Sequence, residues 1–431
     1  MASEAGEVFE CRVARLFSRE GVYARRRVDL DRWVHPARLQ VTDIDVLGIE
    51  FGQDLSTLRT VIECKTGDAK SAPKEIDLML RQVGLKALAQ ADRAVLVVAR
   101  RVSPKARELG TELGVLLQDA DDLDRRESLL GIDRASSWGS HDPTYARFEQ
   151  QMPRQLKADP DLTRVYWLLR SECWNSAPAL SLKRLMSAIE LLGRRWNAET
   201  TGPMRRTVSW LTGDAIVAFS VAAVQLAALA VRLPPSEFRR QVAFRLAEGG
   251  ASIGEMERLS KAVDTYIAGV LGAAGVAPAV SVAALGAFQP TPPGYTDSLL
   301  EVLERLAQQS RRARVLPLYL DIVVAQRVKG RDWRLPDLSL WGIEDADETA
   351  MSGRLVLAFL KGHAGLPEDF ANVLDARPAA ASRRALEISR AVRSGPEQLQ
   401  LATVGKSGEA QLLGESSRAT EPSQSATDRE V

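Results

Sequence analysis

The chain has 431 residues, of which 45% are hydrophobic and 26% charged, and its formal net charge is +1 at pH 7. This composition is typical of a soluble globular protein, and the length exceeds one ordinary core, so we expect two domains with flexible ends. A net charge so close to zero argues against a nonspecific nucleic-acid coat, and any contact with nucleic acid must come from local basic patches.

Cysteine and histidine usage excludes two classes of small stabilised domain. The chain holds three residues of each type, widely scattered, which fits neither a disulfide framework nor a Cys/His zinc site. The N-terminal segment carries Glu4, Glu7 and Glu10 and lacks the basic start and apolar run of a signal peptide. We therefore expect a protein of the reducing cytoplasm.

Two apolar stretches raise the question of a membrane segment. Residues 216–231 are Ala-rich, contain Gln225 and are shorter than the roughly 20 residues that a spanning helix needs. Residues 268–288 are interrupted by Pro278 and several glycines. We interpret both stretches as buried helices of a soluble domain and expect no membrane contact.

The first predicted element is an amphipathic helix over residues 6–20, which Gly21 ends. Its apolar stripe consists of Phe9, Val13, Leu16 and Phe17. At about 100° per residue, Glu10 lies at the edge of that stripe. A helix packed on a sheet would aim Glu10 at the strands, and the alternative is a solvated helix charge.

Residues 22–30 are predicted to form the first strand, with Arg25, Arg26 and Arg27 near its middle. Three consecutive arginines cannot all face a core. We therefore expect some of them to meet solvent at an edge strand, or phosphate if the neighbouring strands form a DNA site.

Residues 41–48 and 61–65 are predicted to be the next two strands, joined by a loop over 51–57 that contains Gly, Asp and Ser. In extended strands side chains alternate between faces, so Glu63 and Lys65 share one face. On the preceding strand Asp43, Asp45 and Leu47 share a face, with Thr42, Ile44 and Val46 on the other. Antiparallel pairing would bring Asp45 to Glu63, with Lys65 beside them. Two carboxylates in that position are a plausible Mg²⁺ site.

The remaining elements of the first domain follow in α/β order. A turn over residues 66–71 leads to a helix that begins near Pro73, has its buried face on Ile76 and Leu80, and carries Gln82 on another face. Residues 94–99 are apolar on both faces, as in a central strand, and a helix after Pro104 leads to a last strand at 114–117. The order α-β-β-β-α-β-α-β predicts a mixed central sheet flanked by helices.

With Asp45 on one strand, Glu63-Cys64-Lys65 on the next, and then a helix and an apolar strand, the first 120 residues resemble the PD-(D/E)xK nuclease superfamily, in the flavour of Mrr-like restriction endonucleases and archaeal Holliday-junction resolvases. The resemblance implies a restriction endonuclease-like fold and a metal-dependent DNA endonuclease. It implies that Asp45, Glu63 and the backbone carbonyl of Cys64 hold Mg²⁺ or Mn²⁺. It also implies that Lys65 stabilises charge or orients the attacking water.

Two further positions are carried over from the resemblance. A glutamate on the first helix often completes such a site, which points to Glu10, and a glutamine on the helix after the E-x-K often reaches it, which points to Gln82. An exposed helical glutamine is the alternative for Gln82. Asp43 competes with Asp45, and Asp45 is preferred because it directly precedes the apolar Val46 and because the second aspartate of such a pair is the catalytic one in Mrr-like sequences.

The rest of the chain reads as a different kind of structure. We divide it into a nuclease domain at residues 1–130, a linker at 131–160 rich in Ser, Gly and Pro, a helical domain at 161–393 and a disordered tail at 394–431. Helical patterns cover 162–174, 181–196, 235–247, 252–271 and 298–312. Residues 315–324 suit either a strand or a buried helix. A mainly α-helical domain therefore follows the α/β domain.

We expect the helical domain to recognise DNA, bind a protein partner or regulate activity, and dimerisation is one way to cut two strands. Its candidate phosphate contacts are Arg194, Arg195, Arg205, Arg206, Arg239, Arg240, Arg311, Arg312 and Arg314. Each of them is also compatible with a solvated helix face. A role in bacterial defence or DNA processing fits the resemblance. The alternative is a binding or assembly protein that keeps the nuclease fold without turnover.

Overall fold

The structure is a computed structural model that describes residues 4–34, 37–67, 74–132, 139–198, 202–248, 253–275, 291–328 and 338–374. All of them belong to one compact unit, Met1–Pro378. The expected tail at residues 394–431 lies outside the described residues.

The first part of the chain follows the predicted order of elements. These are α1 (Glu4–Arg19), β1 (Tyr23–Val34), β2 (Ala37–Phe51), β3 (Thr57–Lys65), α2 (Glu75–Leu88), β4 (Arg93–Val98), α3 (Pro104–Glu112), β5 (Val115–Gln118) and α4 (Ala120–Leu129). The strands form one sheet in the order β1-β2-β3-β4-β5. Strands β1, β2 and β3 pair antiparallel, and β3, β4 and β5 pair parallel. The expected mixed α/β domain is confirmed.

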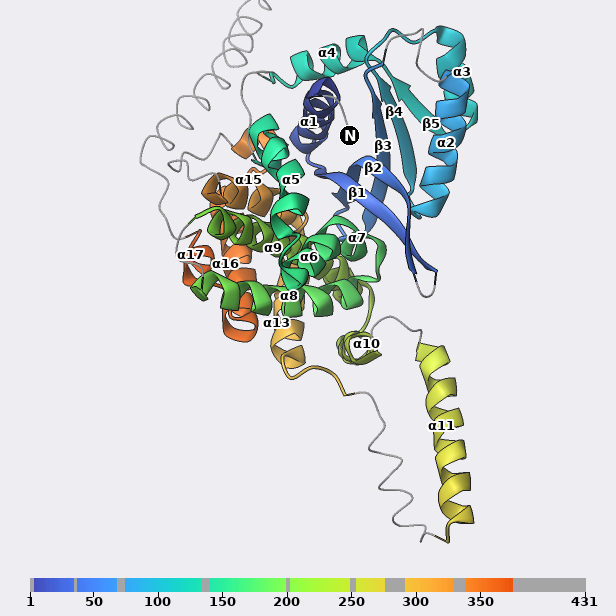
Figure 1. Cartoon of the computed structure of the whole chain (residues 1–431), viewed down its shortest axis with the longest axis vertical. Helices are drawn as coiled ribbons and strands as arrows, with labels where there is room; N and C mark the ends of the chain where they lie inside the picture. The colour runs from blue at the N-terminus through green and yellow to red at the C-terminus, as the bar shows by residue number, and fades with distance from the viewer. Residues whose placement is uncertain are drawn as a thin grey trace, which may run out of the picture. The chain divides into compact units, whose positions relative to one another are not determined.

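Helices cover both faces of this sheet (Figure 1). Helix α1 lies on one face, where Phe9 and Val13 pack with Ile62 and Val95. Helix α2 covers the other face together with α3, and Met79 there belongs to the core that contains Val61 and Leu96. Consecutive residues of β3 thus enter opposite cores, as the side-chain alternation of an extended strand requires.

The second part is helical throughout the described residues. Its helices are η1 (Gly139–His141), α5 (Pro143–Leu156), α6 (Pro160–Trp167), the π-helical turn η2 (Leu168–Glu172), α7 (Cys173–Asn175), α8 (Pro178–Ala198), α9 (Gly202–Arg232), α10 (Pro235–Glu248), α11 (Ile253–Ala273), α13 (Thr296–Gln308), α14 (Ser310–Ala313), α15 (Leu316–Val328), η3 (Leu338–Trp341), α16 (Ala346–Ala364) and α17 (Glu368–Ala371). The stretch that suited a strand or a buried helix is the buried helix α15.

Helix α9 is the central helix of this part and packs against α8, α13 and α15. It is the one described helix that is long and apolar enough to cross a membrane by length and composition, and 78% of its apolar window is buried inside the fold. Burial to that extent is what the core helix of a helical domain shows.

The stretch that we expected to be a linker, residues 131–160, contains an ordered, packed helix. In α5 the side chains of Tyr145, Met152 and Leu156 are buried. They recur at helical spacing, whereas our reading gave more weight to the Gly, Ser and Pro residues that precede them. The expected open linker is therefore wrong for residues 143–156.

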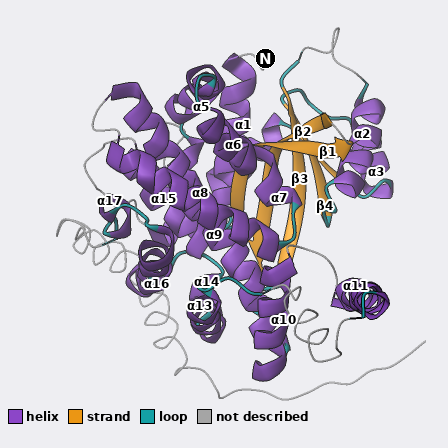
Figure 2. Cartoon of the chain, turned by 60° about the horizontal axis from the view of Figure 1, so that its bottom comes forward, coloured by secondary structure: helices purple, strands orange, loops and turns teal. Residues whose placement is uncertain are grey.

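The helical part packs directly against the nuclease-like sheet, as Figure 2 shows for the helices gathered beside the strands. Tyr23 of β1 stacks on Trp174 of α7 with ring centroids 6.0 Å apart. Ser140 donates hydrogen bonds through its N–H and its hydroxyl to Asp321 of α15, each 3.1 Å long. The two parts therefore share a continuous core.

Arg25 and Arg26 of the arginine run on β1 lie inside this junction, which corrects the expectation of a solvated edge strand, whereas Arg27 pairs with Glu7 and Glu10 of α1. The side chains of Arg25 and Arg26 are 6% and 3% exposed. Arg25 lies 2.7 Å from Asp214 of α9, and Arg26 lies 3.2 Å from Glu149 of α5. Arginines next to each other can be buried because helices far along the chain supply the carboxylates.

Candidate active site

An open pocket of about 500 Å³ lies where β2 and β3 end their ladder. It is lined by Gly6, Glu10, Arg27, Asp43, Asp45, Glu63, Cys64, Lys65, Thr66, Gly67, Arg81 and Arg170. The pocket thus collects side chains from α1, three strands, α2 and the distant π-helical turn η2. Most of the residues singled out by sequence meet here.

Strand β3 supplies an acid and a base on one face. Lys65 Nζ lies 2.6 Å from Glu63 Oε1. Between them Cys64 turns to the opposite face, where it joins the core beneath α1. The predicted alternation along this strand is confirmed, and it places a buried carboxylate against a half-buried ammonium.

Asp45 reaches the same group from β2. The β2–β3 ladder has its last pair at Val46↔Ile62. The next N–H of β3 that points toward β2 belongs to Cys64, and it has no backbone partner in that ladder. The Cys64 N–H donates instead to Asp45 Oδ2 over 2.7 Å. Lys65 Nζ is 3.7 Å from the same oxygen, so one ammonium contacts both carboxylates.

The backbone carbonyl of Cys64 faces this side as well. The N–H and C=O groups of one strand residue point to the same neighbouring strand, and those of the next residue point the other way. The Lys65 carbonyl accepts from Ala99 beyond β4. The Cys64 carbonyl therefore points toward β2 and Asp45, the direction that a metal ligand needs.

The simple alternation predicted for β2 fails at Asp45. Ile44 and Val46 belong to different clusters of buried side chains, although they are two residues apart. Opposite them on β1, Arg27 has a φ of 55°, which is uncommon for a residue other than glycine. It stands between the pairs Arg26↔Val46 and Val28↔Ile44. This local irregularity places the side chains of Ile44 and Val46 on opposite faces of the sheet. A backbone outlier of this kind often marks a functional site.

Charge repulsion and burial both act on Asp45. Burial, with the Glu63 carboxylate next in effect, raises the pKa of Asp45 to about 7, although Lys65 and the Cys64 N–H oppose the rise. Burial by itself lowers the pKa of Lys65, but the Asp45 and Glu63 carboxylates outweigh it and the pKa rises. The pocket therefore attracts positive charge.

Glu10 lies at this pocket, as its place on the helix predicted. It is 6% exposed and pairs with Arg27, whose Nε donates to Glu10 Oε2 over 3.1 Å. Burial raises the pKa of Glu10, and Arg27 only partly offsets that effect. The contact that the structure gives Glu10 is thus with an arginine of β1, one strand away from Asp45.

Gln82 takes neither of the positions that we considered for it. It is fully buried and does not line the pocket. Its Nε2 donates to the backbone carbonyls of Val61 on β3 and Val95 on β4, at 3.0 and 2.8 Å. Gln82 therefore ties α2 to the sheet beneath the site.

Sequence reasoning missed two cations of the pocket. Arg170 comes from η2, more than a hundred residues after Lys65, and nothing local in the sequence indicates that it approaches the strands. Arg81 directly precedes Gln82, and a cation next to that position was the signal available for it. Of the two competing aspartates, the exposed Asp43 lines the pocket, while Asp45 makes the contacts with Cys64 and Lys65.

Residues 1–126 match a family model described as restriction endonuclease, of the Mrr catalytic type. The N-terminal domain is an Mrr-like restriction endonuclease domain. No curated protein and no solved structure matches the chain. The match to the Mrr-like domain includes α1 and all five strands and ends before the helical part begins.

The Mrr-like fold implies a divalent metal, and the donor set suits one. Among the described residues, no three His, Cys, Asp or Glu side chains converge as a ready cage. Asp45 and Glu63 nevertheless both contact one ammonium, which shows that a single cation can reach both carboxylates. With the Cys64 carbonyl they offer three oxygen donors, the kind that Mg²⁺ prefers.

Six of the nine arginines that we considered for phosphate binding in the helical part pair with carboxylates near them. Such pairs join Arg239 to Glu304, Arg240 to Glu237, Arg311 to Glu344, Arg312 to Glu348, Arg195 to Asp159 and Arg205 to Asp369. They are partly or largely exposed, and pairs of this kind are common on solvated helix faces. The cations at the pocket of the Mrr-like domain are therefore better placed for a phosphate.

Proposed function

We propose that the chain is a metal-dependent endodeoxyribonuclease that hydrolyses phosphodiester bonds at the pocket of its Mrr-like domain. One observation carries the proposal: Asp45 and Glu63, 18 residues apart along the chain, both contact the Lys65 ammonium, with the Cys64 backbone beside them. Carboxylates, a carbonyl and a lysine are the groups that metal-assisted phosphoryl chemistry requires.

The roles follow from the positions of the groups. Asp45, Glu63 and the Cys64 carbonyl would hold Mg²⁺ or Mn²⁺. When bound, such a metal polarises the phosphate and lowers the pKa of an attacking water. With the metal on the two carboxylates, the contacts of Lys65 with Asp45 and Glu63 would weaken. The Lys65 ammonium would then contact the phosphate and stabilise the negative charge that develops during attack. Glu10 and Arg27 form the α1 side of the same pocket.

Cleavage of supercoiled plasmid tests the proposal. We expect nicking with Mg²⁺ or Mn²⁺, none with EDTA, and a loss of at least about 100-fold in Glu63→Gln and in Lys65→Met. Glu50→Gln is the matched control, because Glu50 lies on the same sheet, at the end far from the pocket, and pairs with Arg93. Activity that survives in both pocket variants would refute this site.

A second candidate function is DNA or partner binding without turnover. It is favoured by the Lys65 ammonium, which already neutralises part of the carboxylate charge without any metal. Calorimetric titration with Mg²⁺ separates the two. Binding that Asp45→Asn abolishes supports the nuclease, whereas DNA binding with neither Mg²⁺ binding nor cleavage supports the binding protein.

The wider setting belongs to the same proposal. We place the protein in the cytoplasm, in bacterial defence or DNA processing, with DNA as its main partner. The helical part would recognise DNA, bind a protein partner or control activity, and two copies acting together would cut both strands.

A further inference from the structure

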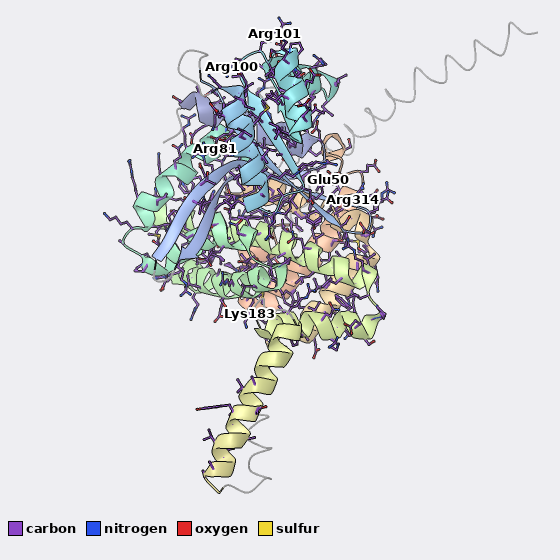
Figure 3. All side chains as sticks on the ribbon, turned by 90° about the vertical axis from the view of Figure 1, so that its right-hand side faces the viewer. Glu50, Arg81, Arg100, Arg101, Lys183 and Arg314 are labelled. Carbon is purple, nitrogen blue, oxygen red and sulfur yellow. The ribbon has the colours of Figure 1, made fainter. Side chains whose placement is uncertain are left out.

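Arg81 has weaker contacts with carboxylates than the other three cations of the pocket have. Arg27 is paired with Glu7 and Glu10, and Arg170 lies 2.7 Å from Glu149. Lys65 is held by the two central carboxylates. The side chain of Arg81 is 53% exposed on α2 (Figure 3).

The contacts of Arg81 are long ones. Its Nη1 lies 3.8 Å from Glu63 Oε1, and its Nη2 donates to the Thr42 hydroxyl over 3.3 Å. An exposed ion pair of this length contributes little stability, and a metal held by Glu63 would weaken it further. Arg81 is therefore the pocket cation that can exchange its present contacts for a phosphate at the least cost.

The position of Arg81 is nevertheless well defined, because the next residue is anchored. Gln82 is fully buried and donates to carbonyls of both β3 and β4. These two hydrogen bonds fix the rotation of α2 about its axis, and the strand that accepts one of them also carries Glu63. A guanidinium held at such a distance from the carboxylates can bind a phosphate through two parallel N–H groups.

We propose that Arg81 is a substrate-binding residue that holds nonbridging oxygens of the DNA phosphate beside Asp45, Glu63 and Lys65, with Gln82 as the residue that positions it. This inference rests on the proposed function, since it names how the same pocket takes its substrate. It assigns the α2 side of the pocket to the DNA backbone. Such a contact adds affinity without base preference.

The test compares Arg81→Gln and Arg81→Lys with Arg93→Gln. Arg93 is a close match: its side chain is 61% exposed, it pairs with Glu50 at 3.5 Å, and it lies at the other end of the parallel strands. A fluorescent DNA duplex is titrated with each full-length protein in EDTA at several salt concentrations. Circular dichroism and melting curves verify that each variant is folded.

We expect Arg81→Gln to bind DNA about tenfold more weakly and to lower the slope of log affinity against log salt by about 0.9, as for one lost phosphate contact. Arg81→Lys should keep the salt slope and recover part of the affinity. The lysine keeps the positive charge but lacks the two parallel N–H donors of the guanidinium. Arg93→Gln should behave as wild type. In Mg²⁺, Arg81→Gln should raise KM more than it lowers kcat.

Equal slopes for Arg81→Gln and Arg93→Gln would overturn the inference and leave the proposed nuclease intact. A wild-type protein that binds but never cleaves, with the expected loss in Arg81→Gln, would support the phosphate contact and refute the hydrolysis. A wild-type protein that does not bind DNA would overturn both.

Discussion

Two clusters of charged side chains lie on the same sheet, and they differ in their access to solvent. The pocket cluster, Asp45, Glu63, Lys65 and Arg81, opens to solvent on one side. The junction cluster, Arg25, Arg26, Asp29, Glu149, Arg170 and Asp214, is buried between β1 and the helical part, and of these residues Arg170 also lines the pocket.

The two clusters contain similar residue types but have different roles. In the junction cluster three arginines face three carboxylates, so the charges balance without any ligand. In the pocket, burial and the neighbouring Glu63 carboxylate raise the pKa of Asp45 to about 7, so this open site favours a bound proton or another cation. Paired charges inside a closed cluster indicate a structural role, and a shifted pKa in an open pocket indicates a binding site.

The largest expected effect concerns the junction cluster. Glu149 contacts Arg25, Arg26 and Arg170, and the three arginines pull its pKa down against the effect of burial. Glu149→Gln leaves buried cations without that carboxylate and should lower the free energy of unfolding by about 3–5 kcal/mol. Denaturant melts measure it.

Glu304→Gln, which breaks an exposed pair with Arg239, is the control for Glu149→Gln and should cost less than about 1 kcal/mol. If both variants lose the same stability, the junction cluster does not hold the two parts together and the contrast with the pocket fails.

A smaller effect of opposite sign is expected in the pocket. The pKa of Asp45 in the folded protein, about 7, lies above its ordinary value of 3.8. The folded state therefore binds the proton more tightly, and the stability from this group, present at low pH, is lost as the pH rises through about 7. In EDTA, Asp45→Asn should be more stable than wild type at about pH 8.5, by about 1–2 kcal/mol, and not at about pH 4.

Thermal melts across pH check this prediction, with the exposed Asp43→Asn as control. Mg²⁺ should remove the advantage of Asp45→Asn, because the metal takes the place of the proton in wild type. A difference between wild type and Asp45→Asn that does not change with pH would contradict the raised pKa of Asp45.

A comparably small effect is expected beneath the pocket, where Gln82 ties α2 to the sheet. Gln82→Leu removes two hydrogen bonds to buried carbonyls and should cost about 1–2 kcal/mol of stability. Its loss of cleavage should not exceed that of Arg81→Gln, since Gln82 acts through the placement of α2. If Gln82→Leu kept normal stability and lost all cleavage, Gln82 would instead take part directly in catalysis.

Much of the α/β domain could be predicted from local pattern. Strand alternation correctly placed Glu63 with Lys65, and the helical stripe brought Glu10 to the pocket, because both depend on one element and its period. The alternation failed at Asp45, where the unusual backbone of Arg27 on the neighbouring strand intervenes.

What sequence reasoning missed depends on residues far apart in the chain. The burial of Arg25 and Arg26 requires carboxylates from α5 and α9, and the approach of Arg170 requires the helical part to pack on β1. The position of Gln82 was predicted wrongly because its partners are backbone carbonyls. Every strand has such carbonyls, so no sequence motif identifies them as partners. Long-range charge pairing has no short-range signature.

The junction cluster also sets a condition on exchanging parts between related enzymes. An Mrr-like domain carrying the arginines of β1, if joined to a foreign helical region, would keep Arg25 and Arg26 without Asp214 and Glu149. Exchange of either part would thus require compensating changes on both sides of the junction. The two parts would therefore have to be transferred together to keep the buried charge pairs of the junction.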